Sequence, residues 1–360
     1  VTSDLKYSFD KASESVIGEV GADVSLSSGD ANLRIPLYSL AQRVEFLKPL
    51  TATLSYSSNI HSSKKVINKY EQTSWVGLGW NLNHGAIIIN HNGTFNNADN
   101  EYLYNDGYKT SKIIQGVDGL VLEDNPYIKF QFTNDATYGV IGCTVKDING
   151  TIYKYGDFIG EGEGPQKASC KIIRWGQRVG NGYGNGTKIY NKLNIASIED
   201  INNNKIEYYY TQETSTLYGA HEYTRSSYVD YILDSYGHKI KFVLGDRDSN
   251  EYETNLQQTF ETYETKFLDK VELYKSDAAS TPYLSFDLVY DSFYNTGILK
   301  KRLLTEVITI GDDIAHNQKT KLEYTPIPLK KLRNSSFNFS INLQYFFFGF
   351  KFIINIIHFL

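Results

Sequence analysis

The sequence predicts an all-β protein, built from multiple antiparallel β-hairpins and sheets in a sandwich-like arrangement. Three observations support this prediction. Apolar and polar residues alternate with a period of two in many short segments, which is typical of half-buried strands. Turn-forming residues separate these segments, and long helical patterns are absent, with residues 253–272 the one ambiguous stretch. Tyrosine, which favours strands, occurs 29 times among 360 residues.

The expected strands follow one another along the whole chain. Their alternating apolar positions are Leu33, Ile35 and Leu37; Leu50, Ala52, Leu54 and Tyr56; Ile128, Phe130 and Phe132; Ile206, Tyr208 and Tyr210; Ile240, Phe242 and Leu244; and Leu284, Phe286, Leu288 and Tyr290. Between them lie turn signals such as Asn92-Gly93, Asn149-Gly150 and Tyr236-Gly237.

A weak internal repeat marks three of the turns. It reads VKDINGTIYKY (145–155), IEDINNNKIEYYY (198–210) and ILDSYGHKIKF (232–242). In each copy an Asp follows an apolar strand, and a Gly or Asn comes three residues later. The pattern predicts a hairpin in which the Asp accepts bonds from turn N–H groups and the Gly or Asn takes a positive φ.

Composition excludes several classes of protein. Hydrophobic residues make up 41% and charged residues 21%, as in ordinary globular proteins, and the net charge is −5. Without a Lys/Arg-rich run, we expect no nucleic-acid partner. Cys143 and Cys170 offer no metal spacing or disulfide framework, and we expect them to be unpaired small residues. The chain has no methionine, even at position 1, so we expect a processed or excised piece of something longer.

The last segment has a different composition. No acidic residue follows Glu323, and YFFFGFKFIINIIHFL (345–360) is strongly apolar. Its sixteen residues are fewer than the roughly 20 that cross a bilayer as a helix. Three interpretations stay open: a tail foreign to the fold, a buried or aggregation-prone strand, and a membrane anchor.

Several stretches resemble the N-terminal region of Rhs/YD-repeat and SpvB-like bacterial proteins, including the B component of insecticidal toxin complexes. They are DVSLSSGDANLRIPLYSL (23–40), LTATLSYSSNI (50–60), WVGLGWNLNHGAIII (75–89), YVDYILDSYGHKIKFVLGDR (228–247) and FYNTGILKKRLLTEVITIG (293–311). The resemblance covers roughly residues 20–325. Asn90 replaces the Arg that usually follows the isoleucine run, and the repeated YD core and the C-terminal cargo are missing.

The resemblance implies a non-catalytic segment of a secreted or surface-exposed bacterial toxin or wall-associated protein. It would contribute to a β-shell around a C-terminal cargo. Its partner would be the remainder of a longer chain or a toxin-complex component. We divide the chain into an N-terminal extension (1–20), a region with the GLGW segment (21–110), a hairpin region (111–325) and the apolar tail (326–360). We expect no cofactor and no metal.

SWVGLGWNLNHGAIII (74–89) places Trp75 and Trp80 around Gly77 and Gly79, with Gly85 beyond. The pattern favours a corner of the core where backbone bends or approaches closely. On a continuous strand the indoles would take opposite faces, one in the core and one toward a neighbouring module. A glycan-stacking site is the alternative, and it supports a carbohydrate-binding or adhesive module. The other expected structural or interaction residues are Pro36, Tyr38, Asp234 and Gly237.

A second alternative is an ADP-ribosyltransferase-like enzyme, because Glu161 and Glu163 spell an E-x-E pair. The pair lies in a Gly/Pro-rich loop without the strand that this chemistry requires. GNGYGNG (180–186) lacks Walker spacing, and the Asp246–Asn250 stretch lacks the later ligands of a calcium loop. His84 and His91 have no nucleophile or ligand set near them in sequence. We therefore predict no catalytic residue.

Overall fold

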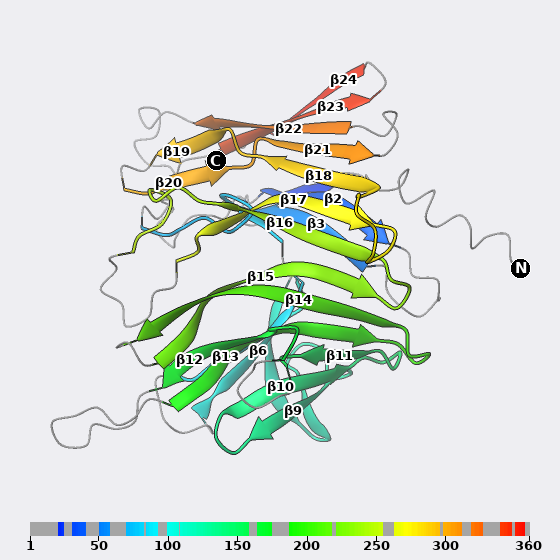
Figure 1. Cartoon of the computed structure of the whole chain (residues 1–360), viewed down its shortest axis with the longest axis vertical. Coiled ribbons are helices and arrows are strands. Elements are labelled where there is room, and N and C mark those ends of the chain that lie inside the picture. The colour runs from blue at the N-terminus through cyan, green and yellow to red at the C-terminus, as the bar shows by residue number, and fades with distance from the viewer. Residues whose placement is uncertain are drawn as a thin grey trace, which may run out of the picture.

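The structure is a computed structural model. It describes residues 21–24, 31–40, 50–57, 70–82, 84–92, 99–107, 109–157, 164–174, 187–217, 221–254, 263–295, 298–311, 318–326, 339–347 and 350–356. These ranges form antiparallel strands joined by turns, and they contain no α-helix (Figure 1), so the all-β prediction is confirmed. Within the same ranges, no helix is long and apolar enough to span a membrane.

Eight strands form a closed barrel in the lower part of Figure 1. In order around the barrel they are β5 (Ala86–Asn90), β6 (Glu101–Asn105), β7 (Thr110–Gly116), β8 (Gly119–Leu122), β9 (Lys129–Asp135), β10 (Gly139–Lys146), β11 (Ile152–Tyr155) and β13 (Thr187–Glu199). Pairing of Leu193 with Ile87 closes the ring between β13 and β5. Strand β12 (Ser169–Arg174) pairs with the first half of β13.

A long antiparallel sheet leaves the barrel at β13. It comprises β14 (Lys205–Leu217), β15 (His221–Asp234), β16 (Lys239–Asp246), β17 (Lys266–Tyr274), β18 (Leu284–Val289), β21 (Glu306–Gly311), β22 (Gln318–Pro326), β23 (Phe339–Phe347) and β24 (Phe350–Ile356). Strands β19 (Ser292–Asn295) and β20 (Lys300–Leu303) form a separate two-stranded ribbon. We call the nine-stranded unit the long sheet.

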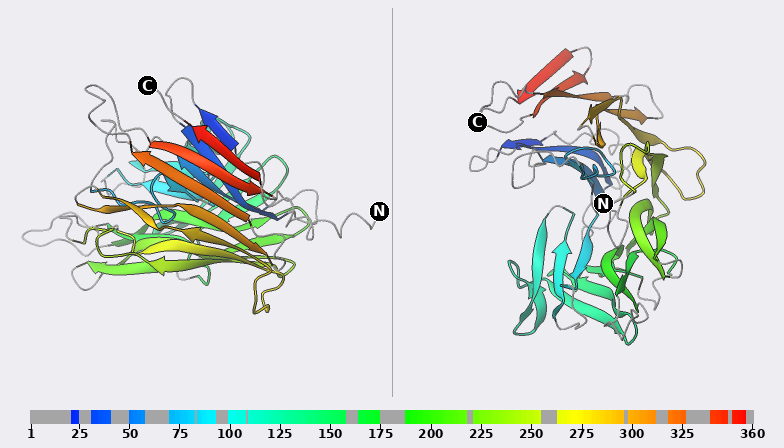
Figure 2. Two further views of the ribbon diagram at one scale, coloured as in Figure 1. Left: turned by 90° about the horizontal axis from the view of Figure 1, so that it is seen from above. Right: turned by 90° about the vertical axis from the view of Figure 1, so that its left-hand side faces the viewer.

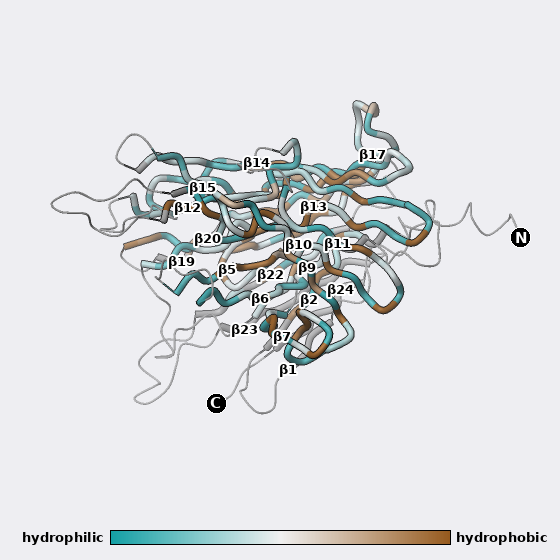
Figure 3. The backbone as a smooth tube through the Cα atoms, turned by 90° about the horizontal axis from the view of Figure 1, so that it is seen from below, coloured by the Kyte–Doolittle hydropathy of each residue, from teal (hydrophilic) through white to brown (hydrophobic). Residues whose placement is uncertain are grey.

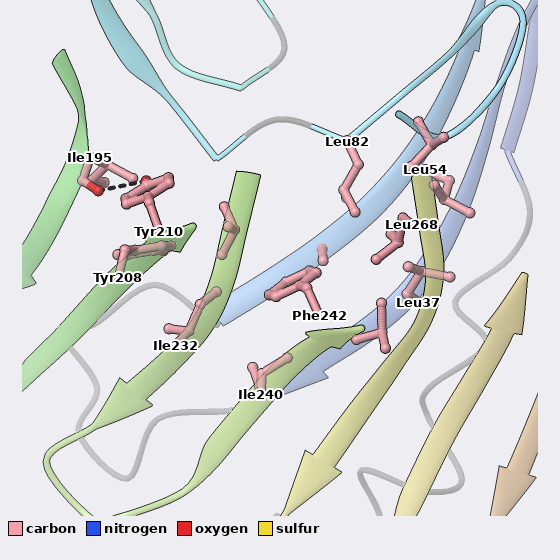
Figure 4. Close-up of a cluster of buried hydrophobic side chains, with 14 of the residues drawn as sticks. Leu37, Leu54, Leu82, Ile195, Tyr208, Tyr210, Ile232, Ile240, Phe242 and Leu268 are labelled. Atoms are coloured by element: carbon pink, nitrogen blue, oxygen red, sulfur yellow. Dashed lines mark hydrogen bonds between the residues drawn. The ribbon is translucent and has the colours of Figure 1, made fainter. Parts of the chain in front are cut away.

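A small sheet covers one face of the long sheet (Figure 2). It comprises β1 (Gly21–Val24), β2 (Ala31–Leu40), β3 (Leu50–Ser57) and β4 (Trp80–Asn81). Leu37 and Leu54 are fully buried and lie near Leu268 of β17 (Figure 4). The alternation that predicts these strands therefore places their apolar sides between two sheets, a sandwich, and burial of each leucine contributes about 1.5–3 kcal/mol.

The described part of the tail is strand. β23 pairs with β22 from Thr320–Tyr345 to Pro326–Phe339, and β24 pairs with β23. Of the three interpretations of the tail, the strand agrees with this backbone. Residues 327–338 and 357–360 lie outside the described ranges.

The three repeated turns share one geometry. Asp147, Asp200 and Asp234 each accept, through Oδ1, the backbone N–H groups two and four residues later, at 2.8–3.0 Å. The residue three positions after each Asp donates its N–H to that Asp's carbonyl at 3.1 Å. Those residues take positive φ, 84° at Gly150, 63° at Asn203 and 86° at Gly237. The turn geometry follows from the sequence pattern.

We expect Asp200→Ala to lower the free energy of unfolding by about 1–3 kcal/mol at neutral pH, because the turn N–H groups lose their acceptor. Desolvation raises the pKa of Asp200, but hydrogen bonds from Asn204 and Asn202 outweigh it and hold the pKa below its usual value. The carboxylate therefore stabilises the fold above its unfolded pKa of about 3.9 and loses that effect as pH falls through the lowered pKa. Urea titrations of both proteins from neutral to acidic pH measure the difference, and a pH-independent difference would contradict this account.

Candidate functional site

The segment Thr73–Asn81, which we call the tryptophan segment, crosses the interior as a compact turn. Gly77 N–H donates to the Ser74 carbonyl at 3.0 Å, and Trp80 N–H donates to the Gly77 carbonyl at 3.3 Å. Ser74 Oγ donates to the Trp80 carbonyl at 2.6 Å. The glycines permit this path because φ is 100° at Gly77 and 78° at Gly79, values that side chains disfavour.

Close packing adds a second requirement at Gly77. A Cβ there would lie 3.2 Å from the Arg302 carbonyl oxygen and 3.4 Å from Leu304 N. Next to it, Leu78 N–H donates to the same Arg302 carbonyl at 2.8 Å. The backbone at Gly77 therefore lies so close to the backbone of Arg302 and Leu304 that a side chain at Gly77 would fit only if the two moved apart.

Trp80 is a buried link between sheets. It is 2% exposed, and its ring centroid lies 5.3 Å from that of Tyr56 on the small sheet. Its indole N–H donates to the Tyr324 hydroxyl at 2.8 Å, which in turn donates to the Leu304 carbonyl at 2.7 Å. The indole thereby joins the small sheet to β22, and burial raises the pKa of Tyr324.

Trp75 packs against the same core from the other direction. Its ring lies 6.0 Å from Tyr228 and 6.2 Å from Phe242, and its carbonyl accepts the Leu268 N–H at 2.8 Å. The opposite-face expectation assumes a continuous strand and does not apply here, because the chain between the two indoles turns. Trp80 is buried and cannot stack on a glycan, whereas Trp75 is half-buried and lines a cavity.

Arg247 holds the start of the tryptophan segment. Its side chain is fully buried, and its Nη2 donates to the Thr73 and Ser74 carbonyls at 3.1 and 2.8 Å. Nη1 donates to Thr73 Oγ1 at 2.8 Å, and Nε to the Lys266 carbonyl at 2.8 Å. Glu264 lies 3.4 Å from Nη2. Burial away from water lowers the pKa of Arg247. The backbone carbonyl groups and Glu264 stabilise the positive charge of the buried guanidinium.

Arg302 holds the other side of the segment. It forms a buried two-point ion pair with Glu251, through Nε at 2.8 Å and Nη2 at 2.5 Å. Its guanidinium carbon lies 3.9 Å from the centre of the Phe267 ring. Arg247, Arg302 and Glu251 are not among the residues predicted from the sequence. The scarcity of arginine, in a chain where lysine far exceeds it, is a signal for Arg247 and Arg302, and no sequence signal marks Glu251.

The other residues that the sequence predicts to have structural or interaction roles lie away from the tryptophan segment. Tyr38 is fully buried on β2, and Pro36 of the same strand is half-buried at an irregularity in its pairing with β3. Gly85 has a φ of 109°, and its carbonyl accepts the Ile195 N–H at 3.2 Å where the barrel closes. Asp234 and Gly237 form the third repeated turn, on the outer edge.

A cavity of about 300 Å³ lies beside the tryptophan segment, between the barrel and the long sheet. Trp75, His84, Lys192, Asn194 and Glu264 are among its lining residues. His84 packs against Phe242, and its Nε2 has no hydrogen-bond partner among the described residues. Burial lowers its pKa to about 4, so the imidazole is neutral at physiological pH.

The catalytic alternatives gain no support from geometry. Glu161, Glu163 and residues 180–186 lie outside the described ranges. Asp246 pairs with Lys266, and the part of the chain that the structure describes contains no group of three His, Cys, Asp or Glu residues suited to a metal.

The other reactive side chains have structural partners or are buried. His91 contacts Asn100 Oδ1 and the Tyr190 carbonyl at 3.0 and 2.9 Å. Cys143 and Cys170 are free, as expected, and burial raises the pKa of both thiols. These surroundings favour packing over chemistry.

No family model and no curated protein matches the chain. Among solved structures, the fold resembles TcdB2-TccC3-TEV with a TM-score of 0.54 and 13% identity, over 93% of this chain and 19% of that chain. It also resembles the Photorhabdus luminescens Tc holotoxin pore, with a TM-score of 0.53 and 13% identity, over 93% of this chain and 18% of that chain. The chain thus spans about a fifth of the length of the solved chains it matches.

The N-terminal domain of the effector SpvB from Salmonella typhimurium strain LT2 gives a TM-score of 0.35 with 14% identity, over 79% of this chain and 92% of that domain. A score at this level does not define a common fold. The structural likeness expected from the sequence is therefore established at the level of the fold, through the Tc toxin chains.

We expect Trp80→Ala to lower the free energy of unfolding by about 3–5 kcal/mol, the cost of emptying a buried aromatic site. Trp80→Phe retains most of the ring but loses the bond to Tyr324, so it should cost less. Chemical denaturation of the three proteins provides the measurement. A Trp80→Ala protein as stable as the parent would rule out a core role.

We also expect Gly77→Ala to destabilise the protein more than Gly237→Ala. Both glycines have positive φ, so alanine is strained at both, by about 1–2 kcal/mol. Only at Gly77 does the added Cβ meet backbone, whereas at Gly237 nothing lies within 4 Å. Thermal unfolding compares the two variants, and equal melting temperatures would show that the close approach is unimportant.

Proposed function

We propose that the chain is a non-catalytic structural segment of a secreted or surface-exposed bacterial toxin-like protein, in which it forms part of a β-shell. The proposal rests on the extent of the structural match, which covers nearly all of this chain but only a small part of a much longer one. Some 93% of this chain corresponds to about a fifth of a Tc toxin chain. A fold that corresponds almost in full to about a fifth of a much longer chain fits a building segment better than an independent module.

The construction of the fold supports the same role. The long sheet extends away from a closed barrel and has one face covered by the small sheet (Figures 1 and 2). At its far end, β24 pairs on one side with β23, and no described strand pairs with its other side. Such an edge accepts a further strand readily. By the resemblance noted in the sequence, that strand would belong to the remainder of a longer Rhs/YD-repeat chain or to a toxin-complex component.

The interior also supports a structural role. The two indoles, which are the chain's strongest candidates for ligand stacking, link sheets instead. The two buried arginines are engaged by backbone carbonyls and Glu251. Trp80 is buried and so cannot stack on a glycan, and Trp75 is half-buried against Tyr228 and Phe242.

Cross-linking and mass spectrometry of the source bacterium test the proposal. We expect this chain to be recovered within, or cross-linked to, a longer polypeptide that contains YD repeats and a variable C-terminal domain. Recovery of the chain as an independent protein bound to polysaccharide would contradict the shell proposal and support the adhesive alternative.

We expect the chain to lack ADP-ribosyltransferase activity, because the glycine-rich sequence around Glu161 and Glu163 predicts a loop that would not hold them within catalytic tolerance. NAD consumption and transfer of labelled ADP-ribose to bacterial and eukaryotic lysates are the measurements, with Glu163→Ala as the matched control. Transfer by the parent that this variant abolishes would replace the structural proposal with an enzymatic one.

A further inference from the structure

The repeated turns form one continuous rim along an edge of the molecule. Pairing of Ile152 with Glu199 places the turn at Asp147 beside the turn at Asp200, and pairing of Ile206 with Asp234 adds the third turn. The loop between β8 and β9 joins the row, because Lys129 pairs with both Val121 and Lys146. Figure 1 shows the three turns together at the right-hand side.

This rim, which we call the turn rim, exposes large apolar side chains at its tips. Tyr127 is 72% exposed, Ile148 76%, Ile201 58% and Tyr236 37%. The Asp pattern of these turns requires a particular backbone, but it does not require an apolar residue at the tip. Figure 3 shows hydrophobic colouring at hairpin tips along this edge. Aligned exposed apolar tips are typical of an interaction surface.

The tips are held in place by contacts between neighbouring turns. Tyr236 donates its hydroxyl hydrogen to Asn204 Oδ1 at 3.0 Å, and Ser235 N–H donates to the Lys205 carbonyl at 2.9 Å. A Cβ on Gly150 would lie 2.9 Å from Ile201 Cγ2, so the first and second turns also touch. Contact with a partner would therefore require little ordering of the turn rim, which lowers the entropic cost of binding.

Size and charge indicate what fits the turn rim. Neighbouring turns lie two strands apart, which is about 10 Å. The row of four turns from Tyr127 to Tyr236 therefore extends roughly 30 Å, about the width of a standard protein–protein interface. The turn carboxylates are occupied by N–H groups, and Lys239 pairs with Asp277. When two identical surfaces meet, side chains of the same kind come close together. Uncharged tips can do so without electrostatic repulsion.

We propose that the turn rim is a self-association surface whose occupant is the turn rim of a second copy of this chain. In a two-fold arrangement Ile148 and Ile201 lie near the axis, and Tyr127 of each copy faces Tyr236 of the other. The exposed Lys146 at the barrel end then approaches the Lys239–Asp277 ion pair at the sheet end, where Asp277 would be shared between the two lysines. This inference is independent of the proposed shell function.

Sedimentation velocity of the full chain, over a wide range of protein concentration, tests the proposal. The expected result is a reversible species of twice the monomer mass of 41.0 kDa. The double variant Ile148→Asp and Ile201→Asp should raise the dimer Kd by roughly tenfold or more, because it places four carboxylates near the axis. Its melting temperature, measured at a concentration where both proteins are monomers, should match the parent because both side chains are exposed.

Val117→Asp is the matched control. Val117 is fully exposed at the turn between β7 and β8, at the opposite end of those strands from the turn rim. This control should dimerise like the parent. A parent that stays monomeric at every concentration would overturn the proposal, as would a dimer that the double variant leaves unchanged or that Val117→Asp weakens equally.

Discussion

The structure depends on satisfying the backbone polar groups of the tryptophan segment, whose residues before strand β4 have no regular sheet pairing. An unpaired buried carbonyl or N–H costs about 1–3 kcal/mol, so this path is tolerable only if every group finds a partner. Arg247 binds the Thr73 and Ser74 carbonyls, and the Leu268 N–H binds the Trp75 carbonyl. These partners come from the long sheet, so the segment is in place only when that sheet has formed.

The same segment is where three parts of the fold meet. Ser57 of the small sheet donates its N–H to the Gly79 carbonyl at 3.0 Å, Leu78 donates its N–H to the Arg302 carbonyl in the β19–β20 ribbon, and Trp80 donates to Tyr324 on β22. A buried ion pair such as Arg302–Glu251 contributes little net stability, but removing one partner is costly. We therefore regard the arginines as the groups that specify one arrangement of the sheets.

Local features of the fold follow from the sequence, and distant pairings do not. Alternation predicts the strands of the small sheet, and the Asp-x-x-Gly/Asn spacing predicts the hydrogen bonding at Asp147, Asp200 and Asp234. Closure of the barrel depends on β13 pairing with β5 across about a hundred residues, and no local pattern encodes that register. The opposite-face expectation for Trp75 and Trp80 holds only for a continuous strand, and periodicity does not reveal the turn between them. The role of Arg247 cannot be predicted from local sequence either, since Thr73 and Ser74, whose carbonyls it binds, lie more than 170 positions away.

Native-state hydrogen exchange shows whether the tryptophan segment opens separately from the sheets. We expect the amides of Ser57, Leu78 and Leu268, which bond to or from the tryptophan segment, to exchange only through global unfolding. Their protection should then equal that of the most protected strands and should change with denaturant in the same way. Exchange of these amides through a local opening, at a lower free energy than the surrounding strands, would contradict the claim that this segment holds the sheets together.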